Sequence, residues 1–267
     1  MFPKLFEIGP LTLHTYGVLL ASACLIAISL AARLAARDGV PKERSWDLGF
    51  IIIVSAIAGA KILMVLTDLN TYLLQDPSRL LSLGFWQAGG VYYGGLLGAF
   101  AGSYLYVKRQ PEICFWTVAD AAAPSIALGQ TIGRLGCFAA GCDYGKPADL
   151  PWAVTFTSEY AHRFVGVPID VSLHPTQLYE SLGTFFLFLT LIWLHRERRF
   201  TGQVFSVYLL SYSVLRFGLE FFRGDVDRGF LPGDVISTSQ FIGLLLFPCA
   251  LFLYWHMRRK PIPATRV

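Results

Sequence analysis

The stretch VISTSQFIGLLLFPCALFLYW, residues 235–255, contains no Asp, Glu, Lys or Arg. A helix of this length rises about 30 Å, which is the thickness of the hydrocarbon core of a bilayer. Residues 13–32 and 89–107 are also uncharged. Over the whole chain of 267 residues, hydrophobic residues make up 54% and charged residues only 15%, whereas soluble domains carry about a quarter charged residues. We therefore expect a chain embedded in a membrane, with little mass left for a soluble domain.

Seven membrane spans fit this pattern, near residues 13–35, 47–67, 89–107, 113–135, 177–195, 203–222 and 235–256. The first apolar run lacks a basic leading segment, so we expect it to stay as the first span and not to be removed as a signal peptide. The third contains GGVYYGGLLGAFAG, whose small residues favour close helix packing. The sequence predicts an all-α integral membrane protein of about seven transmembrane helices, a single polytopic domain over residues 1–267.

Lysines and arginines gather in alternate connections between these spans, at residues 33–44, 108–109, 196–199 and 258–266. The opposite connections hold only Lys4, Arg79, Lys146, Arg163 and Arg228. Positively charged loops are retained on the cytoplasmic side of a membrane. We therefore expect the amino terminus outside and the carboxyl terminus in the cytoplasm. Anionic lipid accounts for the basic loops, and no nucleic-acid partner is expected.

Residues 137–175 form the longest segment outside the spans, inserted between spans four and five. The segment combines KPADLPWAV, FTSEYAHRF and the alternating VGVPIDVSL. We expect a small outer head that contains short strands.

Ionisable side chains within membrane spans are costly, and they usually face a polar cavity or each other. The candidates are Lys61, Arg134, Glu180, Arg216, Glu220 and Arg223. In RFGLEFFR, residues 216, 220 and 223 are spaced so that they share one helix face. A structural ion pair between Arg216 and Glu220, with Arg223 extended toward water, is the simplest interpretation.

Two arginines beside one glutamate, with Arg134 on another helix, predict unpaired positive charge instead. A guanidinium group matches phosphate oxygens in a bidentate manner and stays charged when partly desolvated. The expected topology places Arg134 and Arg216 in the outer half of the bilayer. The anion available at that depth is a phospholipid headgroup, so we expect an anion cavity lined by these arginines.

The segment TIGRLGCFAAGCDYG, residues 131–145, leads us to expect a helix that breaks after Arg134, because glycines at 136, 141 and 145 allow a sharp turn. The thiols of Cys137 and Cys142 fall on the oxidising side. A disulfide clamp, a redox pair and two idle thiols are the alternatives, with the clamp favoured. A metal site is not expected, since no four-ligand set accompanies the pair.

Polar side chains also gather where two spans begin. In HPTQLYES, residues 174–181, His174 and Gln177 are typical of a polar first helical turn, whereas Glu180 lies about one turn into the apolar run and is expected to pair with an arginine or a hydroxyl. His14 and Tyr16 lie at the outer end of the first span, where an interfacial aromatic belt is an equally good interpretation.

Several of these blocks resemble the bacterial prolipoprotein diacylglyceryl transferase family. The resemblance rests on IGPLTLHTYG (8–17), WQAGGVYYGGLLG (86–98), IGRLGCFAAGCDYG (132–145), HPTQLYE (174–180), RFGLEFFR (216–223) and ISTSQ (236–240). It implies a seven-span enzyme of the bacterial inner membrane with a periplasmic head. It also implies transfer of the diacylglyceryl group of phosphatidylglycerol to the lipobox cysteine of a preprolipoprotein, with release of glycerol phosphate and without a cofactor.

The resemblance also assigns expected roles to individual residues. Arg134 would grip the lipid phosphate, and Arg216 with Glu220 would supply a second essential cation. Tyr93 stands where many members have a histidine proposed as the base; its pKa of about 10 makes it a poor base, but it can hydrogen-bond substrate. Cys137 replaces a usual asparagine, and Lys61 a common arginine. The residues expected to bind substrate are Tyr16, His14, Lys61, Arg134, Gly145, His174, Glu180 and Arg223.

Three alternatives remain at this stage. The departures at Tyr93 and Cys137 fit a divergent lipid transferase of the same fold with another acceptor. Charged spans and a glycine-broken helix suit a transporter of an anionic substrate, although the chain lacks an inverted repeat. Cys137 and Cys142 would suit a thiol–disulfide membrane protein.

Overall fold

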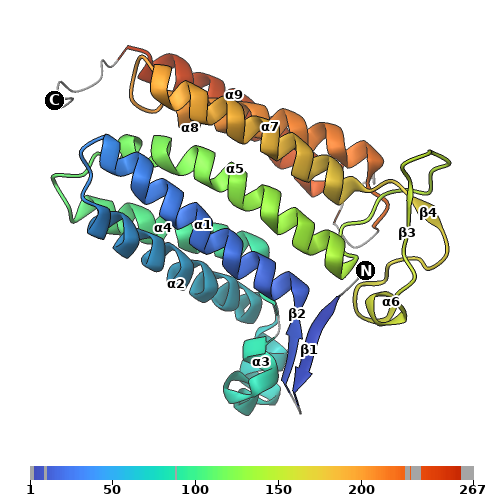
Figure 1. Cartoon of the computed structure of the whole chain (residues 1–267). Helices are drawn as coiled ribbons and strands as arrows, with labels where there is room; N and C mark the ends of the chain where they lie inside the picture. Colours follow the sequence, from blue (N-terminus) through green and yellow to red (C-terminus); the bar gives the residue numbers. More distant parts are fainter. Residues whose placement is uncertain (1–2, 9–10, 88, 226–228, 230–235, 260–267) are drawn as a thin grey trace. The chain divides into compact units, whose positions relative to one another are not determined.

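Helices dominate the computed structural model, which describes residues 3–8, 11–87, 89–225, 229 and 236–259 (Figure 1). A long helix lies at each of the seven predicted positions. These helices are α1 (Thr15–Arg37), α2 (Lys42–Thr67), α4 (Tyr92–Lys108), α5 (Phe115–Ala140), α7 (Thr176–Glu197), α8 (Gln203–Leu219) and α9 (Thr238–Met257).

Five of these helices are long and apolar enough to cross a membrane within the described residues: α1, α2, α7, α9, and α8 together with the 3-10 turn η3 (Glu220–Phe222). Large hydrophobic side chains on them are exposed, as expected of surfaces that face lipid, for example Phe50, Leu182 and Phe252. The chain is therefore a helical, multi-pass membrane protein. Helices α4, which has 17 residues, and α5 are not among these five. The count of seven spans therefore stays a prediction, as does the orientation of the termini.

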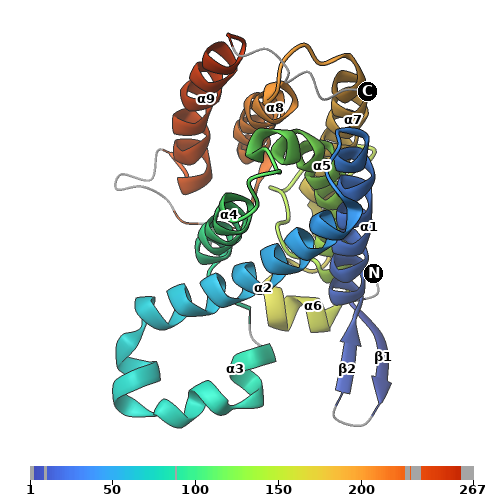
Figure 2. The ribbon, with the colours of Figure 1, turned by 90° about the vertical axis from the view of Figure 1, so that its left-hand side faces the viewer.

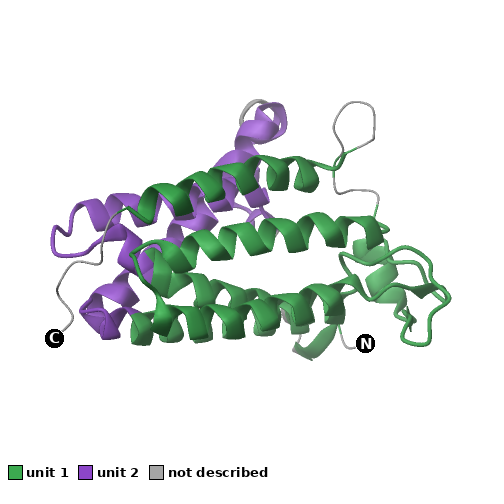
Figure 3. Ribbon diagram, turned by 90° about the horizontal axis from the view of Figure 1, so that it is seen from above, with its two compact units in different colours: residues 1–34, 119–267 green, residues 35–118 purple. Residues whose placement is uncertain are grey.

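The chain divides into two compact units, coloured green and purple in Figure 3. The first unit combines residues 1–34 with residues 119–267, and the second comprises residues 35–118. The single polytopic domain over residues 1–267 stays a prediction.

The second unit is built on close contact between α2 and α4. A Cβ atom placed on Gly98 would lie 2.1 Å from the carbonyl oxygen of Ser55, and one placed on Gly59 would lie 2.3 Å from that of Gly94. Only glycine allows the two backbones to approach this closely. The packing role predicted for the glycine-rich third span is thus confirmed. After α2 the chain continues through short turns, η1 (Asn70–Gln75) and η2 (Pro77–Leu81), into α3 (Leu83–Gln87), as Figure 2 shows.

In the first unit, α7, α8 and α9 run side by side (Figure 1). Side chains of α5, α7 and α8 form a common core that includes Ala127, Leu191 and Val204. The buried carboxylate of Asp120, on α5, accepts hydrogen bonds from the backbone N–H groups of Gly202 (2.7 Å) and Phe205 (2.9 Å). It thereby satisfies donors that the first turn of a helix leaves without intrahelical partners. Asp120 fixes the start of α8 against α5.

The predicted head contains short strands, as expected. Strands β3 (Val154–Thr155) and β4 (Ser172–Leu173) pair antiparallel, and the short helix α6 (Glu159–Val165) lies between them in the sequence. Phe156, Val167 and Leu173 are fully buried and form its core. A second antiparallel pair, β1 (Lys4–Ile8) and β2 (Leu11–His14), precedes α1.

The predicted break after Arg134 is wrong. Helix α5 continues through Gly136 to Ala140, and it ends at Gly141, whose φ of 86° is in the left-handed region that favours glycine. Cys137 therefore lies in the last turn of α5. The bounds 137–175 of the predicted head stay a prediction.

Candidate active site

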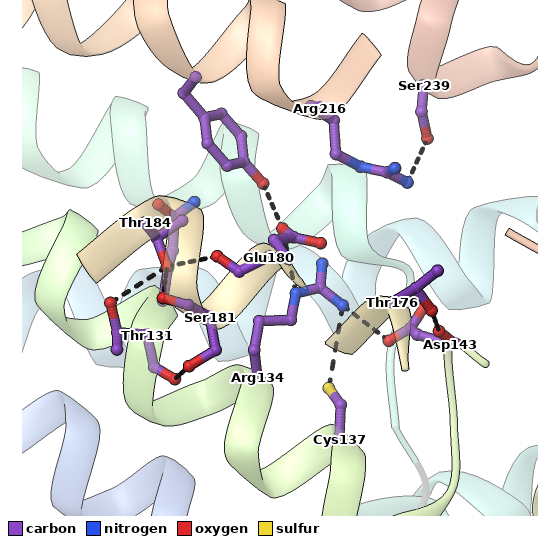
Figure 4. A network of polar contacts seen from close by, with 12 residues as sticks. Thr131, Arg134, Cys137, Asp143, Thr176, Glu180, Ser181, Thr184, Arg216 and Ser239 are labelled. Carbon is purple, nitrogen blue, oxygen red and sulfur yellow. Dashed lines mark hydrogen bonds and ion pairs between the residues drawn. The ribbon is translucent and has the colours of Figure 1, made fainter. Parts of the chain in front are cut away.

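Arg134 projects from α5 and contacts two carboxylates on different segments of the first unit (Figure 4). Its Nε lies 3.0 Å from Oε1 of Glu180, on α7, and its Nη1 donates to Oδ2 of Asp143 at 2.8 Å. Nη1 also lies 3.9 Å from the sulfur of Cys137. The guanidinium group is thus held at two edges by carboxylates, which fixes its orientation.

Glu180 connects Arg134 to α8. Its side chain is buried, and it accepts a hydrogen bond of 3.1 Å from the hydroxyl of Tyr212. Arg216 follows Tyr212 by four residues on α8, so the two side chains share a helix face. In Figure 4, Arg216 from α8 and Arg134 from α5 reach toward the same region beside Glu180. The two arginines that the sequence analysis singled out are therefore brought together.

Arg216 is itself held by two partners. Nη1 donates to Oε2 of Glu220 at 2.6 Å, and Nη2 donates to the hydroxyl of Ser239 at 3.0 Å. Glu220 opens the 3-10 turn that ends α8, and Ser239 lies in the first turn of α9. The predicted ion pair between Arg216 and Glu220 is present, and it ties the end of α8 to α9.

Arg223 takes a different direction. Because α8 ends at Leu219 and the 3-10 turn follows, Arg223 does not share the face of Arg216 and Glu220 as predicted. Its side chain is buried and pairs with Asp143 at 2.5 Å and with Asp225. Asp143 therefore bridges Arg134 and Arg223. Burial acts to raise the pKa of Asp143, but the two guanidinium groups outweigh it and hold the pKa below its ordinary value.

Asp143 is placed by a strained turn and by α7. Its φ of 59° lies in the left-handed region, which residues other than glycine rarely adopt. The hydroxyl of Thr176 donates to the backbone oxygen of Asp143 at 2.6 Å, and the side-chain amide of Gln177 donates to that of Cys142 at 2.7 Å. The first turn of α7 thus holds the turn that follows α5 in place.

The positive charge of the site is paired, contrary to the prediction of unpaired cations. Arg134, Arg216 and Arg223 face four carboxylates: Asp143, Glu180, Glu220 and Asp225. Below, "the arginine site" means these seven residues with Tyr212 and Ser239. Two of these carboxylates, Asp143 and Asp225, lie outside the predicted spans, where an acidic residue does not stand out in the sequence. An anion has to be bound by donors that the carboxylates leave over.

Gly145 allows two segments to meet beside this site. A Cβ atom placed on it would lie 2.3 Å from the backbone oxygen of His174. The backbone N–H of Gly145 donates to that oxygen at 3.1 Å, and Gly145 also forms a β-bridge with Arg223. Close approach, rather than an unusual backbone angle, is what requires glycine here. The imidazole of His174 shares a hydrogen bond of 3.2 Å with Tyr179.

The two predicted residues at the start of α1 lie in the same unit. Tyr16 packs beside α5, since a Cβ atom on Gly136 would lie 3.2 Å from its ring. His14 belongs to β2 and shares a hydrogen bond of 2.8 Å with Tyr160 of the head. Tyr16 is thus near the helix that carries Arg134, whereas His14 links the amino-terminal hairpin to α6.

Lys61 and Tyr93 belong to the second unit, so their predicted roles stay untested. The ammonium group of Lys61 is buried and donates to the backbone oxygens of Phe85 and, at 3.3 Å, Gly89. Within its unit Lys61 therefore fixes the segment that leads into α4. Tyr93 lies in the first turn of α4.

Cys137 and Cys142 are free thiols in this structure. Together with Asp143 they form a cluster whose sulfur and carboxylate oxygen atoms all lie within 4.8 Å of one another. The predicted disulfide therefore remains a prediction.

Sequence reasoning missed four members of the arginine site: Asp143, Tyr212, Asp225 and Ser239. Asp143 lies in the same segment, 131–145, as Arg134, and this proximity in sequence was a usable signal. Tyr212 precedes Arg216 by one helical turn, and this spacing was a usable signal. No local pattern marks Asp225 or Ser239.

Comparison with known proteins gives a consistent result over nearly the whole chain. The family model for prolipoprotein diacylglyceryl transferase matches residues 3–256. A phosphatidylglycerol--prolipoprotein diacylglyceryl transferase of Clostridium tetani is 37% identical over 95% of this chain and 97% of its own length. The enzyme of the same name from Trichormus variabilis is 34% identical over 98% and 92%. One from Clostridium perfringens, numbered 2, is 32% identical over 93% and 92%. The chain belongs to the prolipoprotein diacylglyceryl transferase family.

Proposed function

We propose that this protein transfers the diacylglyceryl group of phosphatidylglycerol to the lipobox cysteine of a preprolipoprotein. The product is a thioether on the peptide, and glycerol phosphate is released. Family membership supports the reaction, and the convergence of Arg134 and Arg216 beside Glu180 supports locating it at the arginine site.

The observation that carries the proposal is a pair of N–H groups left over by the ion pairs. Among the described residues, Nη2 of Arg134 and Nε of Arg216 have no hydrogen-bond partner. Both belong to guanidinium groups whose other edges are fixed by carboxylates or a hydroxyl. A phosphate oxygen between them would receive charge-assisted hydrogen bonds from two helices, which are the strong kind.

Fixed donors of this type suit the chemistry of the reaction. The attacking thiolate forms a bond to the glyceryl carbon next to the phosphate, and the carbon–oxygen bond breaks. Negative charge then accumulates on the departing phosphate. Donors that are already oriented stabilise this charge without having to reorganise, which lowers the barrier. Glu180, Asp143 and Glu220 act as positioning residues, because they hold the two arginines in orientation.

The other residues predicted to bind substrate keep that role in this proposal. Tyr16 and His14 would line the side toward α1, with Gly145, His174 and Arg223 on the side toward the head. Lys61 is also proposed to bind substrate. Tyr93 is proposed to hydrogen-bond substrate and not to act as a base, since a phenol is a weak base at neutral pH.

For the topology we propose seven spans, with the amino terminus outside and the carboxyl terminus in the cytoplasm of a bacterial inner membrane. The concentration of Lys and Arg in alternate connections of the sequence supports this orientation. The head, residues 137–175 as first delimited, then lies on the periplasmic side, inserted in a single polytopic domain. The outer leaflet and an exported lipobox peptide are both available from that side.

A lipid transferase with a different acceptor is the second candidate. Tyr93 and Cys137, which stand where histidine and asparagine are usual in the family, favour it. The two candidates differ in the thiol substrate and agree on the lipid.

Purified protein incubated with labelled phosphatidylglycerol and a lipobox peptide tests the proposal. We expect the peptide cysteine to gain the mass of the diacylglyceryl group, and labelled glycerol phosphate to appear in equal amount. A matched peptide with serine in place of cysteine should gain nothing. Consumption of lipid without modification of the cysteine peptide would favour the second candidate. Binding without any turnover, under conditions where a family member from Clostridium tetani is active, would contradict both.

A further inference from the structure

Three potential metal ligands converge at the end of α5. The sulfur atoms of Cys137 and Cys142 and a carboxylate oxygen of Asp143 lie within 4.8 Å of one another. Cys137 is buried, and the other two are half-buried. The sequence predicts no metal site, because no four-ligand set accompanies the two cysteines. Asp143 supplies a third ligand.

The separations suit a tetrahedral zinc ion. With zinc–sulfur bonds of about 2.3 Å and zinc–oxygen bonds of about 2.0 Å, neighbouring ligand atoms lie about 3.5–3.8 Å apart. The observed upper limit of 4.8 Å requires only small side-chain adjustments. Three protein ligands with one open position are the usual arrangement of catalytic zinc, whereas structural zinc has four protein ligands.

The residues around Cys137, Cys142 and Asp143 make hydrogen bonds of the kind that orient metal ligands. Nη1 of Arg134 lies 3.9 Å from the sulfur of Cys137, and the carboxylate of Asp143 accepts from both Arg134 and Arg223. Hydrogen bonds of this kind to ligating carboxylates are typical of metal sites. Two thiolates and one carboxylate around a dication leave one negative charge, and the guanidinium groups of Arg134 and Arg223 contact this cluster through Asp143.

The backbone of the cluster is fixed from another helix. Gln177 donates to the backbone oxygen of Cys142 at 2.7 Å, and Thr176 donates to that of Asp143 at 2.6 Å. Asp143 keeps its left-handed φ of 59° under these restraints. A backbone conformation that is costly for aspartate is thus maintained where its carboxylate meets the two thiols.

We propose that Cys137, Cys142 and Asp143 bind a zinc ion whose fourth position accepts the thiol of the acceptor peptide. This inference rests on the proposed function, since it names how the thiol is activated. The peptide thiol binds as a thiolate, and its proton passes to water. The sulfur electron pair then forms the bond to the glyceryl carbon, and the electrons of the broken carbon–oxygen bond leave with glycerol phosphate.

The zinc site accounts for two departures from the usual family pattern together. Cys137 becomes a ligand where asparagine is common, and a histidine base is not needed where Tyr93 stands. Zinc lowers the pKa of a coordinated thiol enough to deprotonate it at neutral pH. The neighbouring arginines then hold the lipid phosphate beside the thiolate.

Metal content of the purified protein tests the site without reference to activity. We expect about one zinc per chain in the wild type, as tetrahedral sites bind one ion, measured by elemental analysis after purification without chelators. Cys137→Ser and Cys142→Ser should lose it, and Asp143→Asn should bind at least tenfold more weakly. Cys24→Ser, Cys114→Ser and Cys249→Ser are matched controls, which should keep the metal.

Cobalt substitution then tests the open position. Thiolate-to-cobalt absorption should be present in the wild type and should change when the lipobox peptide is added, but not with its serine analogue. Absence of zinc and cobalt binding in the wild type would overturn the proposal. A disulfide between Cys137 and Cys142 in the purified wild type, identified by mass spectrometry of its proteolytic peptides without reduction, would overturn it as well.

Lipid binding separates this inference from the proposed function. The cysteine variants should still bind phosphatidylglycerol, because the arginines remain, while they lose both metal and transfer. If the wild type transfers the diacylglyceryl group without metal, the zinc site fails and the function stands. If the wild type binds zinc but transfers nothing to any thiol peptide, the function and the role of the open position fail together.

Discussion

Substitution of Arg134 by lysine tests whether the forked shape of the guanidinium group, beyond its charge, is required. Nε of Arg134 faces Glu180 at 3.0 Å, and Nη1 faces Asp143 at 2.8 Å. These carboxylates come from α7 and from the turn after α5, so a single ammonium group cannot contact both and also reach a phosphate oxygen. We expect lysine to pair with one carboxylate and to leave the other without its cation.

The expected loss of unfolding free energy in Arg134→Lys follows from the burial of its partner Glu180. The Glu180 side chain is only 5% exposed, and breaking a buried pair by removing one partner costs about 3–5 kcal/mol. Tyr212 still donates to Glu180, so we expect a loss near the lower end, about 3 kcal/mol of unfolding free energy. Loss of one oriented donor to the phosphate should add about 3–4 kcal/mol to the barrier, roughly a 10²–10³-fold decrease in kcat/KM.

The assay compares kcat/KM for the lipobox peptide with thermal unfolding of the same preparation in detergent. Arg198→Lys is the matched control. Arg198 is also buried, contacts His195 and Asp120, and lies outside the arginine site. This control should lose stability and keep its turnover per folded molecule. Wild-type stability and wild-type kcat/KM for Arg134→Lys would refute the reasoning.

Three further substitutions test the contacts around the site and in the second unit. Tyr212→Phe removes the hydrogen bond to Glu180, and we expect a loss of about 1 kcal/mol in unfolding free energy; thermal melting that matches the wild type would show that Glu180 does not need the hydroxyl. Gly145→Ala places a Cβ atom 2.3 Å from the backbone of His174, so we expect increased proteolysis of the head, whereas Gly218→Ala, which meets nothing within 4 Å, should be at least as stable as the wild type. Equal protease resistance of both glycine variants would contradict the close approach. Gly98→Ala forces α2 and α4 apart, because its Cβ atom would lie 2.1 Å from the Ser55 oxygen; we expect a lower melting temperature, and an unchanged one would be evidence against this packing.

The positions of the long helices could be predicted from the sequence, because a membrane span depends on the hydropathy of about 20 contiguous residues. Each of the seven predicted runs coincides with a helix. The close packing of α2 and α4 could also be predicted, since small residues in an apolar run have a direct steric meaning. The end of α5 could not be placed: Gly136 looked like a breaking point, but in the structure it packs against Tyr16 inside the helix.

The candidate site also contains some residues that could be predicted from the sequence and others that could not. Arginine in an apolar run is unusual enough to identify Arg134 and Arg216 from the sequence. The ion pairs between distant segments could not be predicted from the sequence. Asp143 and Arg223, for example, are 80 positions apart, and no local pattern connects them. The charge balance, the bridge through Asp143 and the cluster with the two cysteines depend on how α5, α7 and α8 pack together.

The sequence alone determined that this chain is helical, enters a membrane repeatedly and carries arginines where an anion could be bound, because hydropathy and the cost of burying charge act on each residue locally. Only the tertiary structure decided that those arginines are already paired, which N–H groups remain for a ligand, and that two thiols and a carboxylate converge. These properties depend on distances between side chains of separate segments, and such distances exist only once the chain has folded.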